Sequence, residues 1–246
     1  NKFKSAEAHQ LRLAFEEVTG RDLNWFFNQW YFSNGHPTVD IDYVYDDAAG
    51  KATVIVKQTQ KTGKYFKLPI AIDVYQGAAK TRYNVWANNA IDSFTIPYTK
   101  RPDLINVDGD KVMLWSKKDN KNLDNYIHQY KYAGSYLDRK EAIDYAATKA
   151  DDPKAVELIR TALNDKYHGL RSYTIGKTDL KKEGIRKATE EVLTGLATTD
   201  KNALVRAGAI GKLGDLQKKE YNNLFITATK DSSYTVAGNA LDRKST

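Results

Sequence analysis

Residues 38–115 carry apolar side chains at alternate positions, and this period of two places them on one face of a β-strand. The first two runs, 39–45 and 52–57, flank a polar turn over Asp46–Gly50, which predicts a β-hairpin. Several short strands with no helical periodicity between them favour an antiparallel β-sandwich over 37–118, and a single sheet backed by helices is the alternative. The further predicted strands are Lys67–Tyr75, Thr81–Ala87, Ser93–Pro97, Leu104–Asp108 and Lys111–Trp115.

An aromatic run precedes these strands. From Trp25 to Phe32, six of eight residues are aromatic. At about 3.6 residues per turn the rings lie on nearly every side of a helix, and such a helix is stable only when it is buried all round. Each ring removes roughly 150–250 Å² from water on burial. We therefore expect this helix to belong to a domain whose other parts lie upstream of Asn1.

Short signals mark the helix boundaries in this region. A preceding helix is predicted over 5–18, and Gly20 permits the left-handed backbone conformation that ends it. Asp22 is predicted to cap the aromatic helix, and Gly35, two residues before a proline, is predicted to end it. The segment 1–36 is thus predicted to be a helical tail of the upstream domain.

Beyond the polar stretch 117–123, which is the predicted domain boundary, every segment has helical periodicity. Asp138, with Glu141 three residues later, is predicted to cap one helix. Asp152, followed by proline, is predicted to begin the next helix. The predicted apolar stripes are Val156, Ile159 and Leu163 in one helix and Ile185, Ala188, Val192 and Leu196 in another.

The helical region contains an internal repeat. The segment LRSYTIGK at 170–177 aligns with VRAGAIGK at 205–212 at an offset of 35 residues, so that Arg171 and Arg206 share the second position. VAGNAL at 236–241 aligns less well, at an offset of 31. A helical repeat of about 30 to 40 residues is typical of stacked helix pairs. Chance similarity of two amphipathic helices is the alternative.

Together these patterns predict a multidomain chain. The three parts are an N-terminal helical tail over 1–36, an antiparallel β-sandwich over 37–118 and an all-α HEAT-like superhelix over 119–246.

Composition changes this picture little. A length of 246 residues with 41% hydrophobic and 28% charged residues is typical of a globular chain of one or two domains. No segment approaches the roughly 20 apolar residues that a membrane helix needs, so no membrane segment is predicted. The sequence has no cysteine, which excludes disulfides and thiolate metal sites but leaves the compartment open; an exported or periplasmic parent protein is compatible with it.

The charge distribution argues against a nucleic-acid partner. The formal net charge of +7 divides into +3 up to Lys118 and +4 after it, and both signs are interspersed in each part. Nucleic-acid binding typically requires basic residues clustered in a patch or stripe. We therefore expect a solvated surface of mixed charge.

Catalytic motifs are absent from the sequence. The His-Glu-x-x-His zinc motif has two histidines four residues apart on a helix, with a glutamate beside the first. No two of the four histidines, His9, His36, His128 and His168, have this spacing. The sequence also lacks a Gly-x-Ser-x-Gly elbow, a glycine-rich phosphate loop and an EF-hand loop. We therefore predict no catalytic, cofactor-binding or metal-binding residue in this chain.

Two weaker metal candidates were weighed. Asp40, Asp42, Asp46 and Asp47 offer the oxygen ligands that calcium prefers, but carboxylates are also expected on the solvent face of a strand, and this second interpretation is favoured. His36, beside a proline, is interpreted as a linker contact rather than as a metal ligand.

Four tyrosines, at 126, 130, 132 and 136, offer the side chains of a substrate groove. Their spacings of four, two and four place only some of them on a common helix face. Packing within the helical region is therefore the favoured interpretation of this set.

The N-terminal segment resembles a known family. Gly–Arg–Asp–Leu at 20–23, Trp–Phe–Phe–Asn–Gln–Trp at 25–30 and Gly–His–Pro at 35–37 resemble the exit from the catalytic domain of zinc aminopeptidases of the aminopeptidase-N type, which are gluzincins. The resemblance covers about the first 40 residues, and the rest agrees only in architecture. It implies a thermolysin-like catalytic domain followed by a small β-sandwich and a helical superhelix.

The resemblance also implies a function. The chain would be a non-catalytic C-terminal fragment that bridges and walls the active-site cleft of an enzyme that removes N-terminal residues from peptides. The fragment alone would be inactive and hold no cofactor, because the zinc of the parent protein is bound outside it. Its partner would be the upstream catalytic domain, contacted through Trp25, Phe26, Phe27, Trp30 and Tyr31. The alternative is an independent adaptor that binds another protein through a HEAT-like solenoid.

Overall fold

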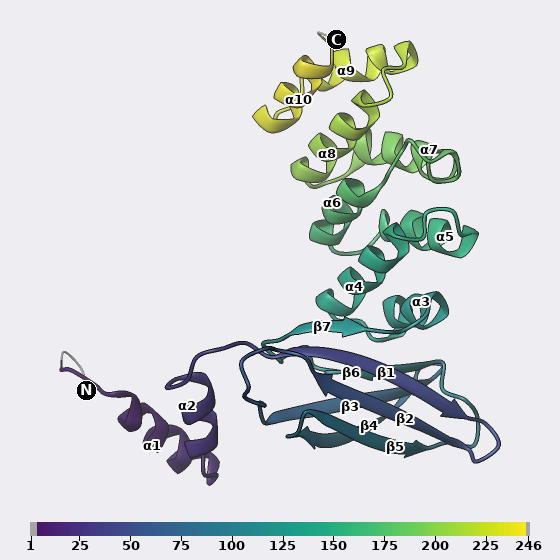
Figure 1. The fold of residues 1–246 in the computed structure, drawn as a ribbon. Helices are drawn as coiled ribbons and strands as arrows, with labels where there is room; N and C mark the ends of the chain where they lie inside the picture. Colours follow the sequence, from purple (N-terminus) through teal and green to yellow (C-terminus); the bar gives the residue numbers. More distant parts are fainter. Residues whose placement is uncertain (1–3, 245–246) are drawn as a thin grey trace. The chain divides into compact units, whose positions relative to one another are not determined.

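The computed structural model describes residues 4–244, which contain α-helices and two β-sheets (Figure 1). Residues 1–3 and 245–246, at the ends of the predicted segments 1–36 and 119–246, lie outside the described residues. The strands are β1 (Thr38–Asp46), β2 (Lys51–Gln58), β3 (Leu68–Gln76), β4 (Ala79–Ala87), β5 (Ile91–Pro97), β6 (Leu104–Val107) and β7 (Ser116–Asp119). The helices are α1 (Ala8–Thr19), α2 (Asn24–Trp30), α3 (Leu123–Tyr132), α4 (Tyr136–Ala147), α5 (Pro153–Ala162), α6 (His168–Lys177), α7 (Glu183–Thr199), α8 (Ala203–Gly214), the short 3₁₀ helix η1 (Lys219–Tyr221), α9 (Asn222–Ala228) and α10 (Tyr234–Lys244).

The chain divides into two compact units that alternate along the sequence. The first unit contains α1, α2 and the sheet formed by β1, β2, β5 and β7, and the second contains all helices from α3 onward. The first unit is Asn1–Ile70, Asn84–Thr99 and Val112–Asn120, and the second is Ala71–Tyr83, Lys100–Lys111 and Lys121–Thr246.

The sheet of the first unit has the strand order β5-β2-β1-β7. The hairpin predicted around Gly50 is confirmed, because β1 and β2 pair antiparallel and Gly50 has a φ of 60°. The last strand differs from the prediction: residues 111–115 are irregular, and β7 follows them and pairs parallel to β1. The sheet is therefore mixed, and the predicted polar boundary 117–123 contains most of a strand and the start of α3.

A second sheet has the order β4-β3-β6, with β3 and β6 antiparallel. All four residues of β6 are buried. The buried set includes Asn106 and, on β3, Asp73, whose carboxylate is bound by Lys80 and Arg82. Polar groups buried in this way require partners, and Asp73 marks a place where charge is fixed inside the second unit.

The N-terminal helices follow their sequence signals in part. Gly20 ends α1 in the left-handed conformation, with a φ of 65° and its N–H bonded to the carbonyl of Glu16, which confirms the predicted stop. The aromatic helix α2 begins at Asn24 rather than directly after Asp22, whose carboxylate accepts a hydrogen bond from the Asn24 backbone N–H at 2.8 Å. Asp22 therefore shapes the entry to α2 without being its N-cap residue.

The helices of the second unit pack in succession. Contacts join α3 to α4, α4 to α5 and α6, α5 to α7, α6 to α8, and α8 to α7 and α10 (Figure 1). One apolar core contains Ile143, Ile159 and Leu170, and a second contains Leu193, Ile210 and Val236. Within residues 4–244, no helix is both long and apolar enough to cross a bilayer.

The helix starts in this unit show one confirmed prediction and one wrong prediction. Asp152 caps α5, and its side chain accepts a hydrogen bond from the Lys154 N–H. The predicted cap at Asp138 is wrong, because α4 begins three residues earlier and Ser135 is its N-cap residue. Asp138 is fully buried, so its carboxylate interacts with groups inside the protein and does not cap a helix at the surface.

Candidate functional site

Asp138 lies in a buried polar network that joins β6, α3 and α4 within the second unit. The Lys111 ammonium is 2.9 Å from Asp138 Oδ1 and donates a hydrogen bond to Asn106 Oδ1 at 2.8 Å. The Asn106 amide donates to Asp138 Oδ1 at 3.0 Å, and the Ser135 hydroxyl donates to Oδ2 at 2.7 Å. Gln129 on α3 donates to the backbone carbonyl of Asp138 at 3.0 Å.

The electrostatics of Asp138 reflect this packing. Burial opposes the ionised carboxylate, but the Lys111 ammonium and the hydrogen bonds from Ser135 and Asn106 outweigh it and hold the pKa of Asp138 below its ordinary value. The Lys111 side chain is only 5% exposed. The backbone at Asp108 and Lys111 has positive φ, at 56° and 54°, and this turn carries the ammonium into the network. The network is therefore a fixed buried charge pair and has no free acid or base to offer a substrate.

A set of ion pairs, half-buried for the most part, repeats along the helices. Each of three arginines near the start of a helix binds an aspartate just before the start of a later helix: Arg139 on α4 with Asp165, Arg171 on α6 with Asp200, and Arg206 on α8 with Asp231. We call these pairs the Arg–Asp ladder. Arg171 and Arg206 each form two hydrogen bonds to their aspartate at 2.7–2.9 Å. Each also donates to the backbone carbonyl six residues earlier, at 2.8 Å.

Two of the ladder arginines, Arg171 and Arg206, were recognised in the sequence as a shared position of the repeat, but their aspartate partners were not predicted. Asp165, Asp200 and Asp231 are separated by 35 and 31 residues, which are the offsets of the repeat itself. Each aspartate also accepts a hydrogen bond from the backbone N–H two residues later at 2.8 Å. The recurrence of an aspartate at the repeat offset is therefore the sequence signal that could have identified the partners of the ladder arginines.

The second unit also has an apolar groove between α3 and α5, with a volume of about 900 Å³. Ile127, Tyr130 and Leu158 contribute apolar surface to it. Arg139 and Asp165 of the ladder lie along it, and the Tyr130 hydroxyl donates to Asp165 at 2.8 Å. Burial and the negative charge of Asp165 raise the pKa of Tyr130, so this hydroxyl stays protonated. The groove therefore combines apolar walls with the ion pair between Arg139 and Asp165.

The four histidines lie in separate places. His9 pairs with Glu7 on the exposed side of α1, and His36 lies 3.3 Å from the Ser116 hydroxyl. The His128 ring contacts Tyr132 and its Nε2 lies 2.8 Å from the Gly77 carbonyl oxygen, while His168 packs beside Tyr167. Among the described residues, no group of three or more potential metal ligands is present.

The four aspartates considered as calcium ligands have individual partners in three cases. Asp42 accepts from the Asn120 amide at 2.6 Å, Asp46 from the Ala49 N–H at 2.9 Å, and Asp47 from the Tyr98 hydroxyl at 2.6 Å. They do not form a ligand cluster in the described part of the chain, and neither does Asp40.

The four tyrosines do not share one surface. Tyr126 is buried and stacks on Tyr145 with ring centroids 4.3 Å apart, and Tyr132 packs on His128. Only Tyr130 lines the groove between α3 and α5. Tyr136 is exposed at the start of α4.

The aromatic helix α2 is covered on one side only. Phe27 is 3% exposed, Trp25 contacts Trp86 with centroids 5.1 Å apart, and Trp30 contacts Phe66 at 5.4 Å. The other face is bare, because Phe26, Tyr31 and Phe32 are exposed. This chain's own residues therefore cover Phe27 and one face of α2, and the expected cover of the other face by an upstream domain stays a prediction. On α1, the exposed apolar side chains are Leu11, Leu13, Phe15 and Val18.

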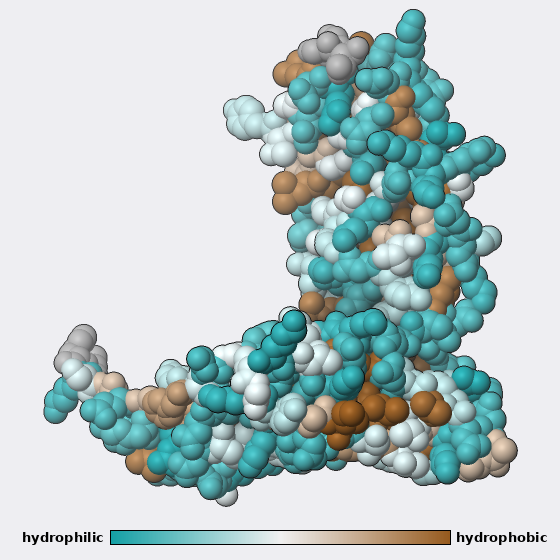
Figure 2. Space-filling view, viewed as in Figure 1, coloured by the Kyte–Doolittle hydropathy of each residue, from teal (hydrophilic) through white to brown (hydrophobic). Residues whose placement is uncertain are grey.

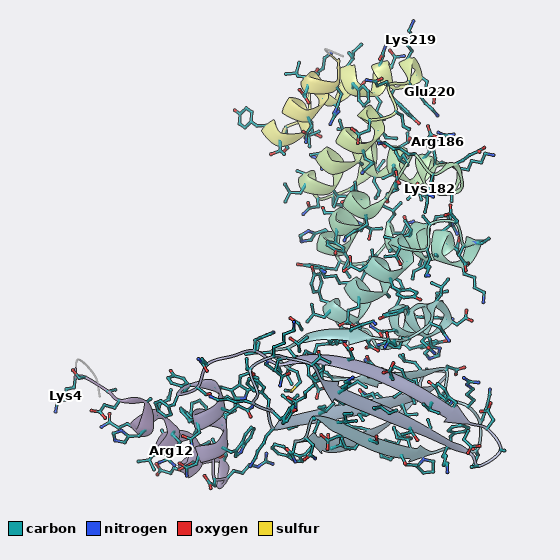
Figure 3. The ribbon with its side chains drawn as sticks, viewed as in Figure 1. Lys4, Arg12, Lys182, Arg186, Lys219 and Glu220 are labelled. Carbon is teal, nitrogen blue, oxygen red and sulfur yellow. The ribbon has the colours of Figure 1, made fainter. Side chains whose placement is uncertain are left out.

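Charged side chains of both signs alternate over the second unit. Lys182 and Arg186 extend from the start of α7, and Lys219 and Glu220 lie on η1 (Figure 3). Lys182 pairs with Asp151 at 3.1 Å, and Lys218 pairs with Glu220 at 3.2 Å.

Comparison with known proteins gives a structural match. No protein-family model matches this sequence, and no curated protein sequence matches it. Among solved structures, the fold is similar to that of Legionella pneumophila aminopeptidase A, determined in complex with aspartic acid. The TM-score is 0.68 at 11% sequence identity, and the match covers 95% of this chain. The chain spans about a third of that protein, with 34% of it covered. The likeness shows an aminopeptidase-related fold.

Proposed function

We propose that this chain is a non-catalytic part of a zinc-dependent aminopeptidase of the aminopeptidase-N type. The observation that carries the proposal is the fold match over 95% of the chain to about a third of an aminopeptidase. The Trp–Phe–Phe–Asn–Gln–Trp segment at 25–30 supports it independently, because that resemblance rests on sequence rather than on fold.

In this proposal the chain has an architectural role. The region 37–118 is the bridging β-sandwich of the parent enzyme, and the helices from α3 onward are the HEAT-like superhelix that walls its active-site cleft. The Arg–Asp ladder supports a repeated architecture, since each ladder pair fixes the start of one helix to a helix earlier in the chain. A wall of this kind limits which peptides reach the catalytic centre.

The catalytic chemistry lies outside this sequence. The reaction would be removal of the N-terminal residue of a peptide by zinc-activated water, and zinc would be held by the catalytic part of the protein. The sequence contains no pair of histidines at the required spacing. What the described residues contribute is rigid support, and not a proton donor or a metal ligand.

The exposed side of α1 and α2 is the proposed contact with the catalytic part. Phe26 on α2, Tyr31 and Phe32 directly after it, and Phe15 and Val18 on α1 are between 40% and 86% exposed. Several large apolar side chains exposed on neighbouring segments mark an interaction site. Trp25 and Trp30 contribute to it only through the parts of their rings that Trp86 and Phe66 leave uncovered.

The proposal is tested by comparing this chain with the longer protein encoded by its gene. Both are assayed with aminoacyl p-nitroanilides in the presence of zinc. We expect turnover by the longer protein and none by residues 1–246 alone. Turnover by this chain would contradict the proposal, as would a longer protein without a zinc-binding His-Glu-x-x-His helix.

The alternative is an independent adaptor that binds another protein. The groove of about 900 Å³ between α3 and α5 is the observation that favours it, because apolar grooves between helices are common docking sites. A gene that encodes no peptidase sequence beside this chain would favour the adaptor.

A further inference from the structure

Large exposed side chains recur at the starts of α4, α6, α8 and α10 in the second unit. They are Tyr136 and Leu137, each 43% exposed, Tyr167 at 45%, Leu204 at 62% and Tyr234 at 96%. We call these five residues the edge row. None of the hydrophobic cores of the second unit includes them. Tyr234, at 96% exposure, gains almost no packing energy from its own chain. The recurrence of large exposed side chains at four helix starts therefore calls for a binding partner.

The edge row follows successive helix starts, which the Arg–Asp ladder ties to one another. Each ladder arginine lies in the first turn of its helix, and its aspartate lies three residues before the first residue of the next helix of the series. The Tyr136 and Tyr167 rings are in contact, with centroids 5.8 Å apart. α4, α6, α8 and α10 follow one another along one side of the helical unit, where hydrophobic residues reach the surface between polar ones (Figures 1 and 2).

The charge along this edge is positive. Lys166 and Lys201 each follow a ladder aspartate directly, are exposed, and form no ion pair with any residue between 4 and 244. The ladder aspartates themselves do not offset them. The side chains of Asp165 and Asp200 are 3% and 4% exposed and are bound to arginines, so their charge is neutralised below the surface.

We propose that the edge row is a docking site for an extended peptide segment that carries acidic side chains between apolar ones. Neighbouring helices lie about 8–10 Å apart. An extended chain in the polyproline II conformation advances about 3.1 Å per residue with three residues per turn, so about three residues span one helix step and every third side chain faces the row. An apolar side chain at every third position meets the aromatic and leucine side chains of the row. The acidic residues between them meet Lys166 and Lys201.

This inference does not rest on the proposed function, since such a site serves an adaptor as well as an aminopeptidase. It concerns residues of the second unit only. Binding is measured directly, without enzymatic turnover, so the failure of one proposal is distinguishable from the failure of the other.

The test uses residues 1–246 and a fluorescein-labelled peptide with phenylalanine at every third position and aspartate or glutamate between. Fluorescence anisotropy at physiological salt reports binding. Two matched peptides are the controls: one has lysine in place of every acidic residue, and the other has alanine in place of every phenylalanine. We expect saturable binding of the first peptide and a loss of about tenfold or more in affinity for each control peptide.

Two double variants test the location. Lys166→Glu with Lys201→Glu is expected to weaken binding about tenfold or more by reversing the two free charges. Leu204→Ser with Tyr234→Ser is expected to weaken it by a similar factor through lost apolar contact. The matched control is Lys187→Glu with Lys219→Glu, an equal change of charge on α7 and η1, away from the row, and it should leave affinity within about twofold. All six positions are on the surface, and circular dichroism melts establish that each variant is folded.

The following outcomes overturn the proposal. The lysine peptide binds as tightly as the acidic one, or the Lys187/Lys219 variant loses as much affinity as the Lys166/Lys201 variant, which would indicate general charge attraction. Equal binding of a single-stranded oligonucleotide has the same meaning. Self-association of the chain that the Leu204/Tyr234 variant abolishes, seen by sedimentation, would assign the row to a second copy instead.

Discussion

The Lys111 ammonium and the Asp138 carboxylate lie 2.9 Å apart and are almost completely removed from solvent. The two residues are 27 positions apart in the sequence, one after β6 and the other in the first turn of α4. Asn106 and Ser135 supply the remaining hydrogen bonds of the carboxylate. The pair therefore fixes α4 to the sheet that contains β6, within the second unit.

Lys111→Met is expected to destabilise the protein by about 3–5 kcal/mol, because it leaves the Asp138 charge buried without its counter-ion. The free energy of unfolding is measured by urea denaturation monitored by circular dichroism. Lys154→Met is the matched control, since Lys154 also pairs with an aspartate, Asp124 at 2.7 Å, but on the exposed surface. It should leave the urea midpoint unchanged.

A double-mutant cycle separates the pair from the rest of the network. Lys111→Met combined with Asp138→Asn removes both charges and keeps an amide for the Ser135 and Asn106 contacts. We expect the double variant to be more stable than the sum of the single changes indicates. Simple additivity would mean that the two charges do not interact in the folded protein.

The pH dependence of stability tests the lowered pKa of Asp138. A carboxyl group with a lower pKa in the folded than in the unfolded state stabilises the fold fully above the ordinary aspartate pKa of about 4. That stabilisation is lost as the pH falls below this value and through the native pKa. Urea midpoints at pH 7 and pH 3 should therefore differ less for Asp138→Asn than for the unmodified protein. Equal differences would contradict the assignment.

The Arg–Asp ladder predicts that lysine cannot replace its arginines. Arg171→Lys loses the double hydrogen bond to Asp200 and the bond to the Asp165 carbonyl, so we expect a loss of about 1–3 kcal/mol in unfolding free energy. The control is Arg160→Lys, because Arg160 also forms two hydrogen bonds to a carboxylate, Glu157, but on an exposed helix surface. A loss for Arg160→Lys as large as for Arg171→Lys would show that bidentate geometry alone, without burial, sets the cost.

The period of the apolar residues predicted the positions of most strands and helices, because each depends on local geometry. It failed at 111–115, where alternating side chains resemble a strand. Val112 and Leu114 are 69% and 70% exposed there, and the positive φ values at Asp108 and Lys111 have already turned the chain out of the sheet. Lys111, at the start of this segment, forms a long-range ion pair with Asp138, and no local pattern contains such a contact.

The candidate surfaces were predictable to different extents. The helical repeat pointed to Arg171 and Arg206, and its offsets also held the positions of their aspartates. Asp138 was misassigned because a carboxylate near a helix start has the same sequence signature whether it caps the helix or is buried beneath it. The cover of α2 came from Trp86 and Phe66, whose places depend on how the strands pair and not on the aromatic run itself.

The two sides of α2 should respond in opposite ways to substitution. Phe27 is 3% exposed, so Phe27→Ala is expected to cost about 3–5 kcal/mol of unfolding free energy through lost burial and the cavity that remains. Phe32 is 63% exposed, so Phe32→Ser should leave the urea midpoint unchanged and raise the concentration at which the isolated chain stays monomeric. Light scattering over a concentration series measures the second effect. If Phe32→Ser also lowered the urea midpoint, the bare face of α2 would be part of the chain's own core, and its proposed contact with a catalytic domain would lose its support.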